Sequence, residues 1–195
     1  MKVVRKKRKF NLKLNKLKIN KEPIVSSPKT ISETNDGKFK EKKLFKINSH
    51  LYMSGYHSAK DLKCLNSHGI THVINLTTHR CPNLHQEKME YSSFALSDNI
   101  NFNLLSCLDI IVNTIEAKIN EGKRVLVHCK MGISRAPSIV LAFLIIKNKM
   151  TFQNAFENLQ RINSEISPNF GFLMQLQRVE ELTCLLYTSP SPRDS

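Results

Sequence analysis

The sequence of 195 residues lacks any apolar run long enough to cross a membrane. No apolar segment at its N-terminus is typical of a secretory signal. Its five cysteines and seven histidines show neither Cys-x-x-Cys spacing nor another arrangement that would hold a metal ion. We therefore expect a protein with no transmembrane segment, no metal centre and no cofactor.

Acidic residues are scarce at the N-terminus, where residues 1–21 hold ten basic residues and no acid. Residues 1–43 contain 15 lysines and arginines against four acids, a net charge of +11, whereas residues 44–195 contain 15 against 12, a net charge of +3. The basic character thus belongs to a tail. Because residues 1–43 have no sustained apolar period, we predict that they are disordered. The near-neutral remainder gives no reason to expect nucleic-acid binding by the domain.

Three interpretations of the basic tail stay open. The cluster at residues 5–9 is typical of a nuclear-import signal or of a patch for anionic surfaces. Followed by Leu12 and Leu14, it is also similar to the docking peptides that bind mitogen-activated kinases. A solvated arm with no dedicated partner is the third interpretation. A mitochondrial presequence is disfavoured, because such peptides are rich in Arg and Ser and this tail has no serine before Ser26.

One short run carries the chemistry of the chain, His128-Cys129-Lys130-Met131-Gly132-Ile133-Ser134-Arg135. It lies where an apolar strand at 124–127 becomes an apolar helix that starts near Arg135. Backbone N–H groups of such a loop and of the first helical turn have no intrahelical acceptor and can bind an anion. Gly132 permits the close turn, and Arg135 offers a planar fork of donors for two phosphate oxygens. The same positive field favours the thiolate form of Cys129.

This run resembles the signature of the cysteine-based protein tyrosine phosphatases, in particular the small dual-specificity phosphatases. The resemblance covers residues 44–182 and implies hydrolysis of phosphotyrosine and phosphoserine or phosphothreonine in phosphoproteins through a phosphocysteine intermediate. It also implies that Cys129 is the nucleophile, that Arg135 clamps the phosphate, and that His128 orients the loop and supports the thiolate through the backbone. The loop residues that would hold the phosphate with Arg135 are Lys130, Met131, Gly132, Ile133 and Ser134.

The reaction also needs a carboxylic acid that protonates the leaving oxygen and then activates water. Asp98 follows a strand-like run at 91–96 and precedes Asn99 in a loop, which is where similar phosphatases carry their acid. The alternative is a turn formed by the Asp-Asn pair. Other acids upstream of Cys129 lie in a segment with helical periodicity and are interpreted as a solvated helix face; they are Asp109, Glu116 and Glu121.

Asn169 lies in a Ser-Pro-Asn-x-Gly-Phe segment that resembles one near the end of such domains, and we expect it to brace the active-site loop. After the arginine, the family usually has Ser or Thr, whose hydroxyl stabilises the departing sulfur, whereas this chain has Ala136. Loss of that hydrogen bond costs roughly 1–3 kcal/mol by analogy with other charge-stabilising donors, so we predict slow phosphoenzyme breakdown. Lys130 also resembles one lysine of the loop of the lipid phosphatases, but Ile133 replaces the second.

Two further functions therefore stay open beside a protein phosphatase. One is a phosphatase of phosphoinositides or of RNA 5′ ends, and the other is a phosphate-binding pseudophosphatase, for which Ala136 is the one favourable mark. Because a catalytic thiolate needs a reducing compartment, we expect the protein in the cytoplasm, the nucleus or both. The chain offers no counterpart of the phosphotyrosine-recognition loop of the tyrosine-specific enzymes, which implies a shallow pocket.

Alternation of strands with helices predicts an α/β fold with a mostly parallel central sheet flanked by helices, as in the protein tyrosine phosphatases. Strands are expected at 47–54, 71–76, 91–96 and 124–127, and helices at 58–68, at 103–121, from Arg135, from Thr151 and from Gly171. Cys129 should lie at the carboxyl edge of the strands. Residues 184–194 are similar to the translation of a transposase adapter used to build sequencing libraries, so we expect the natural product to diverge after about Thr183.

Overall fold

The computed structural model describes residues 43–77 and 81–188, and for residues 184–188 it describes the backbone alone. Except at Lys43, the predictions for the basic tail lie outside the described residues. So does most of the C-terminal segment 184–194, although the backbone of its first five residues continues the last helix. Within the described part of the chain, no helix is both long enough and apolar enough to span a bilayer.

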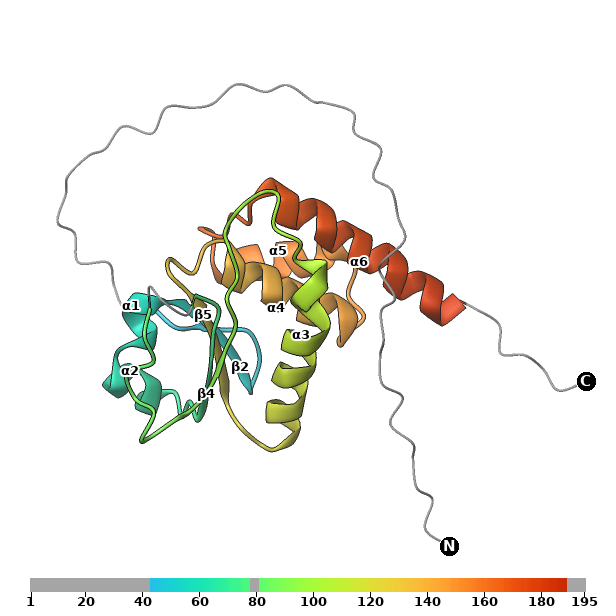
Figure 1. Cartoon of the computed structure of the whole chain (residues 1–195). Helices are drawn as coiled ribbons and strands as arrows, with labels where there is room; N and C mark the ends of the chain where they lie inside the picture. Colours follow the sequence, from blue (N-terminus) through green and yellow to red (C-terminus); the bar gives the residue numbers. More distant parts are fainter. Residues whose placement is uncertain (1–42, 78–80, 189–195) are drawn as a thin grey trace, which may run out of the picture. The chain divides into compact units, whose positions relative to one another are not determined.

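Five strands form one sheet in the order β1-β2-β5-β3-β4 (Figure 1). Only β1 runs antiparallel to its neighbour, and the other three pairings are parallel. The strands are β1 (Phe45–Lys46), β2 (Leu51–Gly55), β3 (His72–Asn75), β4 (Glu90–Ser93) and β5 (Val125–Cys129). The predicted mostly parallel α/β architecture is confirmed, and β5 occupies the centre of the sheet.

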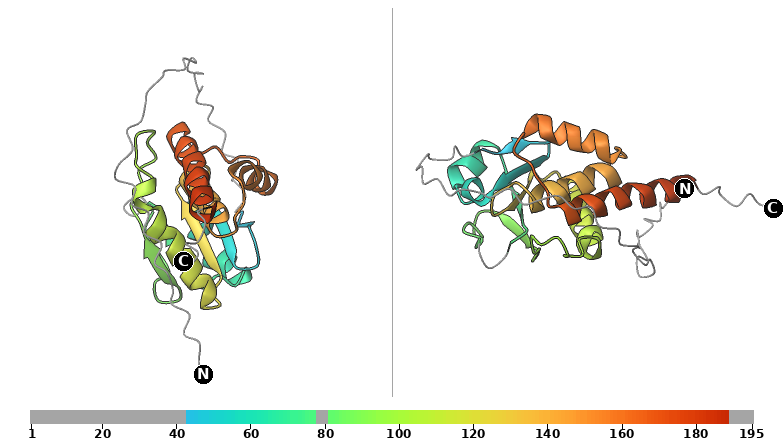
Figure 2. Two further views of the ribbon diagram at one scale, coloured as in Figure 1. Left: turned by 90° about the vertical axis from the view of Figure 1, so that its right-hand side faces the viewer. Right: turned by 90° about the horizontal axis from the view of Figure 1, so that it is seen from above.

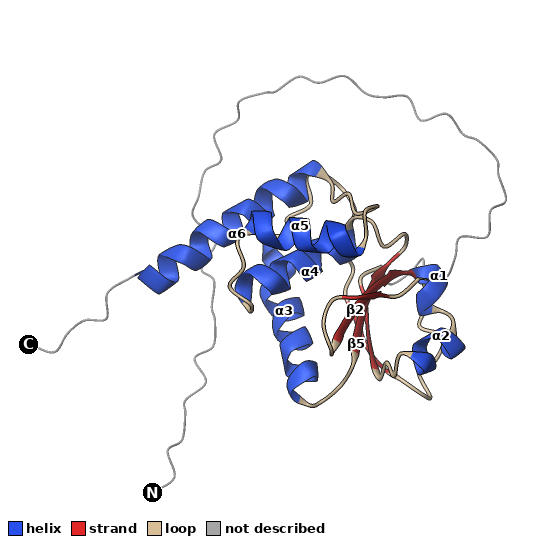
Figure 3. Ribbon diagram, turned by 180° about the vertical axis from the view of Figure 1, so that it is seen from behind, coloured by secondary structure: helices blue, strands red, loops and turns tan. Residues whose placement is uncertain are grey.

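Within the described residues, six helices lie on the two sides of this sheet, as Figure 3 shows with helices in blue and strands in red. Two short helices lie on one face and the four longer ones on the other. They are α1 (Tyr56–Ala59), α2 (Leu62–Ser67), α3 (Leu105–Asn120), α4 (Arg135–Ile146), α5 (Phe152–Ile162) and α6 (Phe170–Thr188). Because each face of the sheet is apolar, each layer of helices closes its own hydrophobic cluster.

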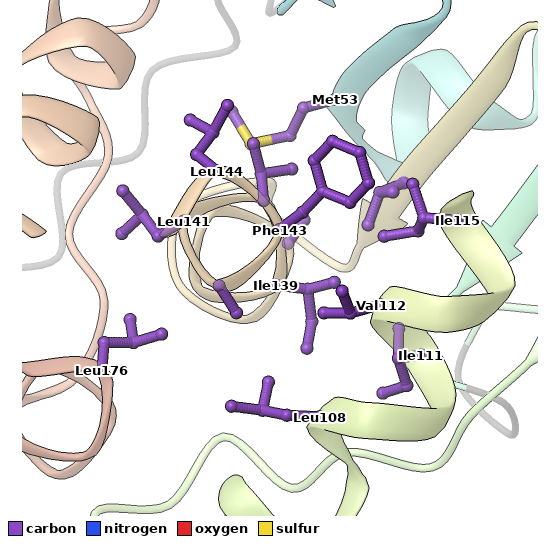
Figure 4. Packing of buried hydrophobic residues seen from close by; sticks show 14 of the residues in the cluster. Met53, Leu108, Ile111, Val112, Ile115, Ile139, Leu141, Phe143, Leu144 and Leu176 are labelled. Atoms are coloured by element: carbon purple, nitrogen blue, oxygen red, sulfur yellow. The ribbon is translucent and has the colours of Figure 1, made fainter. Parts of the chain in front are cut away.

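Helix α4 is the central element of the larger cluster. Every residue from Ala136 to Ile146 is buried, as the apolar composition of this segment predicts. Figure 4 shows Ile139 and Phe143 of α4 directed toward α3, and Leu141 on the side of Leu176 in α6. A helix packed on all sides cannot shift without opening cavities, so its N-terminus is fixed at the end of β5.

Two predicted elements are wrong in their extent at the start of the domain. The single strand expected at 47–54 is a turn followed by β2, because the Asn48 side chain accepts hydrogen bonds from the N–H groups of His50 and Leu51 at 2.9 and 2.8 Å. The helix expected at 58–68 is divided into α1 and α2, since Asp61 leaves the helical conformation and caps α2. Asparagine and aspartate favour such local bonds over continued regular structure.

The later elements agree more closely with the sequence. Thr151 caps α5 by accepting a hydrogen bond from the Asn154 N–H at 3.2 Å, as predicted. Phe172, Leu176 and Val179 of α6 are buried, as expected. The strand predicted at 91–96 ends earlier, at Ser93, and the remainder joins the loop that leads to α3.

Candidate active site

Cys129 is the last residue of the central strand and is almost completely buried, with 2% of its surface exposed. Its Sγ accepts a hydrogen bond of 3.2 Å from the N–H of Gly132. The loop 130–134 thus curls back over the sulfur before α4 begins at Arg135. The structure therefore brings the predicted nucleophile to the carboxyl edge of the sheet, at the bottom of a short loop.

The curl of this loop depends on two glycines that meet backbone to backbone. Gly132 has a φ of +76°, and a Cβ placed on it would lie 2.6 Å from the Gly55 nitrogen. A Cβ on Gly55 would lie 2.8 Å from the Met131 carbonyl oxygen. Only residues without side chains can occupy both positions, because real Cβ atoms do not approach that closely.

The peptide groups of the loop are oriented by hydrogen bonds on its two flanks. The Lys130 carbonyl accepts from the Tyr56 N–H at 3.1 Å, and the Ile133 carbonyl accepts from the Ser167 N–H at 2.9 Å. In a planar trans peptide the following N–H points away from the carbonyl. The N–H groups of Met131 and Ser134 are therefore directed away from these flanks, toward the interior of the loop.

Ser134 occupies the N-cap position of α4 but does not cap the helix. A serine at this position commonly accepts a hydrogen bond from an N–H of the first turn, and no such bond forms here. Its Oγ instead donates to Asp98 at 2.7 Å. The first N–H groups of α4 have no intrahelical acceptor, so this end of the helix keeps its donors available for an anion.

Arg135 lies beside these donors with 15% of its side chain exposed. One terminal nitrogen donates to the Leu96 carbonyl at 3.3 Å. Its Nε lies 3.5 Å from an Asp98 oxygen, close enough for an ion pair. The same Nε is buried and makes no hydrogen bond among the described residues, because the geometry of that contact is unfavourable. A buried donor without an acceptor is rare, and a bound oxyanion would satisfy it.

Asp98 is brought to the loop from the segment between β4 and α3. Its Oδ1 accepts hydrogen bonds from Ser134 Oγ at 2.7 Å and from the Asn169 amide at 2.9 Å, and its Oδ2 faces Arg135. The carboxylate is 36% exposed. By contrast, Glu116 pairs with Lys147, the residue that follows the last turn of α4, at 2.7 Å. Asp98 is therefore the predicted acid that the structure places beside Ser134 and Arg135, at the end of the loop that follows Cys129.

Asn169 joins three parts of the site. Its N–H donates to Ser134 Oγ at 3.2 Å, its amide nitrogen donates to Asp98, and its amide oxygen accepts from the Phe172 N–H at 3.0 Å. The last bond caps α6. One residue, through its backbone N–H and its side chain, thereby links the start of α6, the loop before α4 and the loop that carries Asp98, an arrangement in keeping with the bracing role expected for it.

His128 is buried directly below the loop, and burial lowers its pKa from 6.5 to about 4. The ring is therefore neutral near pH 7. Its Nδ1 lies 3.5 Å from the Cys129 carbonyl oxygen, at the outer limit of a hydrogen bond, and the Tyr56 ring lies 6.0 Å away from it, centroid to centroid. His128 can orient the backbone of the loop, but it supplies no positive charge to the sulfur.

Ala136 follows Arg135 in the first turn of α4 and is completely buried. It belongs to the same hydrophobic cluster as Cys129. Among the described residues, no group of three His, Cys, Asp or Glu side chains could hold a metal ion.

A separate hollow of about 720 Å³ lies at the amino ends of β3 and β4. In its lining, Glu90 accepts hydrogen bonds from Lys118 at 3.3 Å and Lys123 at 2.6 Å and contacts His72 at 3.3 Å. These partners lower the pKa of Glu90 to about 2. Cys129 does not reach this hollow, because it lies at the carboxyl end of β5, whereas the hollow lies at the amino ends of the parallel strands.

Sequence reasoning missed two contributors to the site. Gly55 directly follows the strand predicted at 47–54 and had no expected role, yet it pairs in register with Cys129 and admits the loop. Ser134 was assigned only to phosphate binding, whereas its hydroxyl contacts Asp98. A glycine at the carboxyl end of the strand neighbouring the nucleophile was the available signal for Gly55. No sequence pattern indicated the partner of Ser134.

Comparison with known proteins agrees with this geometry. The family described as "Dual specificity phosphatase, catalytic domain" matches residues 51–181. Human dual specificity protein phosphatase 1 is 39% identical over 132 residues, which is 67% of this chain and 35% of that protein. Arabidopsis thaliana protein-tyrosine-phosphatase MKP1 is 30% identical over 153 residues, which is 78% of this chain and 20% of that protein.

Among solved structures, the human tyrosine phosphatase-like serine/threonine/tyrosine-interacting protein is 29% identical with a TM-score of 0.69. The superposition covers 74% of this chain and 99% of that one. The chain spans well under half of the length of the curated relatives named above. Since the family match extends over two thirds of the sequence and includes the whole loop from Cys129 to Arg135, the chain belongs to the dual-specificity phosphatase catalytic-domain family.

Proposed function

We propose that this chain is a protein phosphatase that hydrolyses phosphotyrosine and phosphoserine or phosphothreonine through a phosphocysteine at Cys129. The observation that carries the proposal is the unsatisfied Nε of Arg135 beside the uncapped start of α4. Both sets of donors belong to the first turn of α4, which directly follows the loop whose Gly132 N–H donates to the sulfur. An oxyanion with several acceptor oxygens is the ligand that such a cluster of donors fits.

In the first step of the proposed reaction, the Cys129 thiolate attacks phosphorus and forms the S–P bond while the bond to the leaving oxygen breaks. Asp98 gives its proton to that oxygen. Arg135 and the N–H groups of the loop and first helical turn stabilise the charge on the equatorial phosphate oxygens. The products are the dephosphorylated hydroxyl group and the phosphocysteine.

In the second step, the Asp98 carboxylate accepts a proton from a water molecule as that water attacks phosphorus. The S–P bond breaks and the sulfur leaves as a thiolate, which regenerates Cys129 and releases inorganic phosphate. Gly132 N–H, which already donates to Sγ, stabilises the returning thiolate. Ala136 provides no hydroxyl for the same purpose, so we propose that this step limits turnover.

The proposed substrates are phosphoproteins because the two curated relatives named above are called protein phosphatases. The alternative is a protein that binds phosphate without turnover. Ala136 favours it, and so does the similarity to a human protein whose name describes it as phosphatase-like and as an interacting protein. The presence of Cys129, Asp98 and Arg135 in one site favours the enzyme. A role of the basic tail in kinase docking or in nuclear import, and a location in the cytoplasm, the nucleus or both, belong to this proposal as well.

The proposal is tested by following turnover of a small aryl phosphate, resolved from milliseconds to minutes. We expect wild-type protein to show a burst of phenol release followed by a slower steady rate. Cys129→Ser should abolish both phases while still binding vanadate, and Cys107→Ser on α3 should retain them. Folded wild-type protein that binds vanadate but releases no phenol would contradict the enzyme and favour the binding protein.

A further inference from the structure

Three large apolar side chains stand exposed on one side of the candidate active site. Ile100 is 53% exposed, Phe170 63% and Met174 51%. We propose that they form an apolar shelf, defined by these three residues, that binds an apolar side chain next to the phosphorylated residue of a protein substrate. This inference rests on the proposed phosphatase function and specifies which phosphoproteins the site would prefer.

The shelf is one continuous surface, because the loop that carries Ile100 is packed against the first turn of α6. A Cβ added to Gly171 would lie 1.9 Å from the Ile100 carbonyl oxygen, so the two backbones are in contact. The Gln175 side chain donates to the Phe102 carbonyl at 2.9 Å and accepts from the Leu104 N–H at 2.8 Å. Figures 1 and 2 show this loop, in green, alongside the start of α6, in red.

Helical spacing places Phe170 and Met174 in one row on α6, since residues four apart lie on the same face. The neighbouring row, Gly171 and Gln175, faces the loop between β4 and α3, and the opposite row is buried with Phe172. The row of Phe170 and Met174 is therefore exposed on the side of the helix that adjoins Ile100. Exposed large apolar side chains grouped in this way are typical of binding surfaces.

The occupant of the shelf follows from its continuity with the phosphate-binding loop. Phe170 is the residue after Asn169, whose amide touches Asp98 at 2.9 Å and whose N–H contacts Ser134. A phosphorylated peptide that places its phosphate in the loop must leave the pocket over one of its rims. On this rim the first side chains beyond the catalytic groups are apolar. Aromatic residues and methionine are common at protein-binding surfaces, where they contact apolar partners.

The shelf is tested with phosphotyrosine peptides that differ at single positions. Four positions are varied, the two before and the two after phosphotyrosine, and at each of them one peptide carries leucine and its matched partner carries serine. In wild-type protein we expect leucine at one position to raise kcat/KM about tenfold over serine, the discrimination typical of one added apolar group. Phe170→Ser and Met174→Ser should each bring that ratio close to one. Turnover of an aryl phosphate by each variant normalises the peptide rates.

Ile110→Ser is the matched control, because Ile110 is equally exposed, at 61%, but lies on α3 outside the shelf. It should leave the ratio at its wild-type value. Equal kcat/KM for leucine and serine peptides in wild-type protein would overturn the proposal of the shelf, and so would a preference that survives in both shelf variants. Turnover of the aryl phosphate would in either case still support the proposed phosphatase function. Absence of aryl phosphate turnover in wild-type protein would instead remove the function on which the shelf rests.

Discussion

Asn169 and Asp98 lie 71 residues apart in the sequence and are joined by a hydrogen bond of 2.9 Å between the amide nitrogen of one and the carboxylate of the other. The same asparagine caps α6 through its amide oxygen. The last helix of the domain is thereby connected directly to the proposed general acid. Its two contacts can be separated by substitution, because they use different atoms of one side chain.

Asn169→Ser should retain the cap of α6 and lose the bond to Asp98. Serine caps helices about as well as asparagine, so we expect the free energy of unfolding to change by less than about 1 kcal/mol. With the acid less well positioned, kcat/KM, which reports the first chemical step, should fall roughly tenfold for aryl phosphates with poor leaving groups. Phenols of low pKa, which need little protonation, should be affected less.

The measurement is kcat/KM across a series of aryl phosphates, with unfolding by urea in parallel. Asn169→Ala loses both contacts and should show the same kinetic change together with a destabilisation of about 1 kcal/mol. Equal losses of kcat/KM for good and poor leaving groups in Asn169→Ser would show that Asn169 does not position the acid.

Ala136→Ser should accelerate breakdown of the phosphoenzyme. A hydroxyl in the first turn of α4 restores a donor for the departing sulfur, and one such donor is worth roughly 1–3 kcal/mol, so the steady rate should rise about tenfold or more. The burst of phenol should shrink as the second step ceases to limit turnover.

Rapid-mixing measurements of phenol release separate the two steps. Ala142→Ser provides the matched control, because Ala142 is equally buried on α4 one and a half turns beyond Ala136. It should leave the ratio of burst to steady rate unchanged. An unchanged burst in Ala136→Ser would mean that the missing hydroxyl is not what slows the second step.

Much of the fold was predictable because its strongest signals are local. The apolar composition of residues 136–146 indicated a buried helix, and the strand–loop–helix context of Cys129 indicated an anion site. The breaks at Asn48 and Asp61 were missed because each depends on one side chain that accepts hydrogen bonds from nearby N–H groups. Such local bonds differ little in free energy from a continued strand or helix, so the sequence pattern does not show which of them forms.

The site itself was predictable in its residues but not in its connections. Asp98, Cys129 and Arg135 could be named from spacing and family resemblance. The bond from Ser134 to Asp98 and the close approach of Gly55 to Gly132 arise from tertiary packing between distant segments. No periodicity in the chain records such contacts, so they required the three-dimensional arrangement.

Gly132→Ala should be far more damaging than Gly122→Ala, although the two glycines have nearly the same φ, +76° and +77°. A Cβ at Gly122 meets nothing within 4 Å, so its substitution costs only the strain of a left-handed alanine, about 1 kcal/mol. A Cβ at Gly132 would collide with the backbone of Ser54 and Gly55, which cannot yield as a side chain could.

We therefore expect Gly132→Ala to lose several kcal/mol of stability, as overpacking at a fixed backbone does, and to lose both vanadate binding and turnover. Gly122→Ala should keep both. Urea denaturation and vanadate titration of the two variants check this. Similar stability losses would show that the backbone contact between Gly132 and Gly55 tolerates a side chain.

His128 should make the domain sensitive to mild acid. Its pKa is about 4 in the folded protein because burial disfavours the charged ring, against an ordinary value of 6.5 for the unfolded chain. The unfolded state therefore binds a proton between these values and the folded state does not. The stabilising contribution is fully present above pH 6.5, declines as the pH falls, and is lost once the pH passes about 4.

Linkage gives the size of this effect. Between pH 7 and pH 5, His128 alone should reduce the free energy of unfolding by about 2 kcal/mol. His128→Asn, if folded at pH 7, should lack that part of the decline, whereas His57→Gln, at an exposed position, should retain it. Burial also lowers the pKa of His72, which adds a decline of the same sign to every variant, so the difference between variants isolates His128.

Unfolding by urea at pH 7 and pH 5 measures the decline, and NMR of the imidazole protons provides a check that does not depend on a substitution. The His128 ring of the folded wild-type protein should stay neutral at pH 5. A ring that titrates near 6.5 in the folded protein would contradict the prediction. It would also mean that His128 carries positive charge beside Cys129 under mildly acidic conditions, and the stabilisation of the thiolate would then no longer rest on Arg135 and the backbone donors alone.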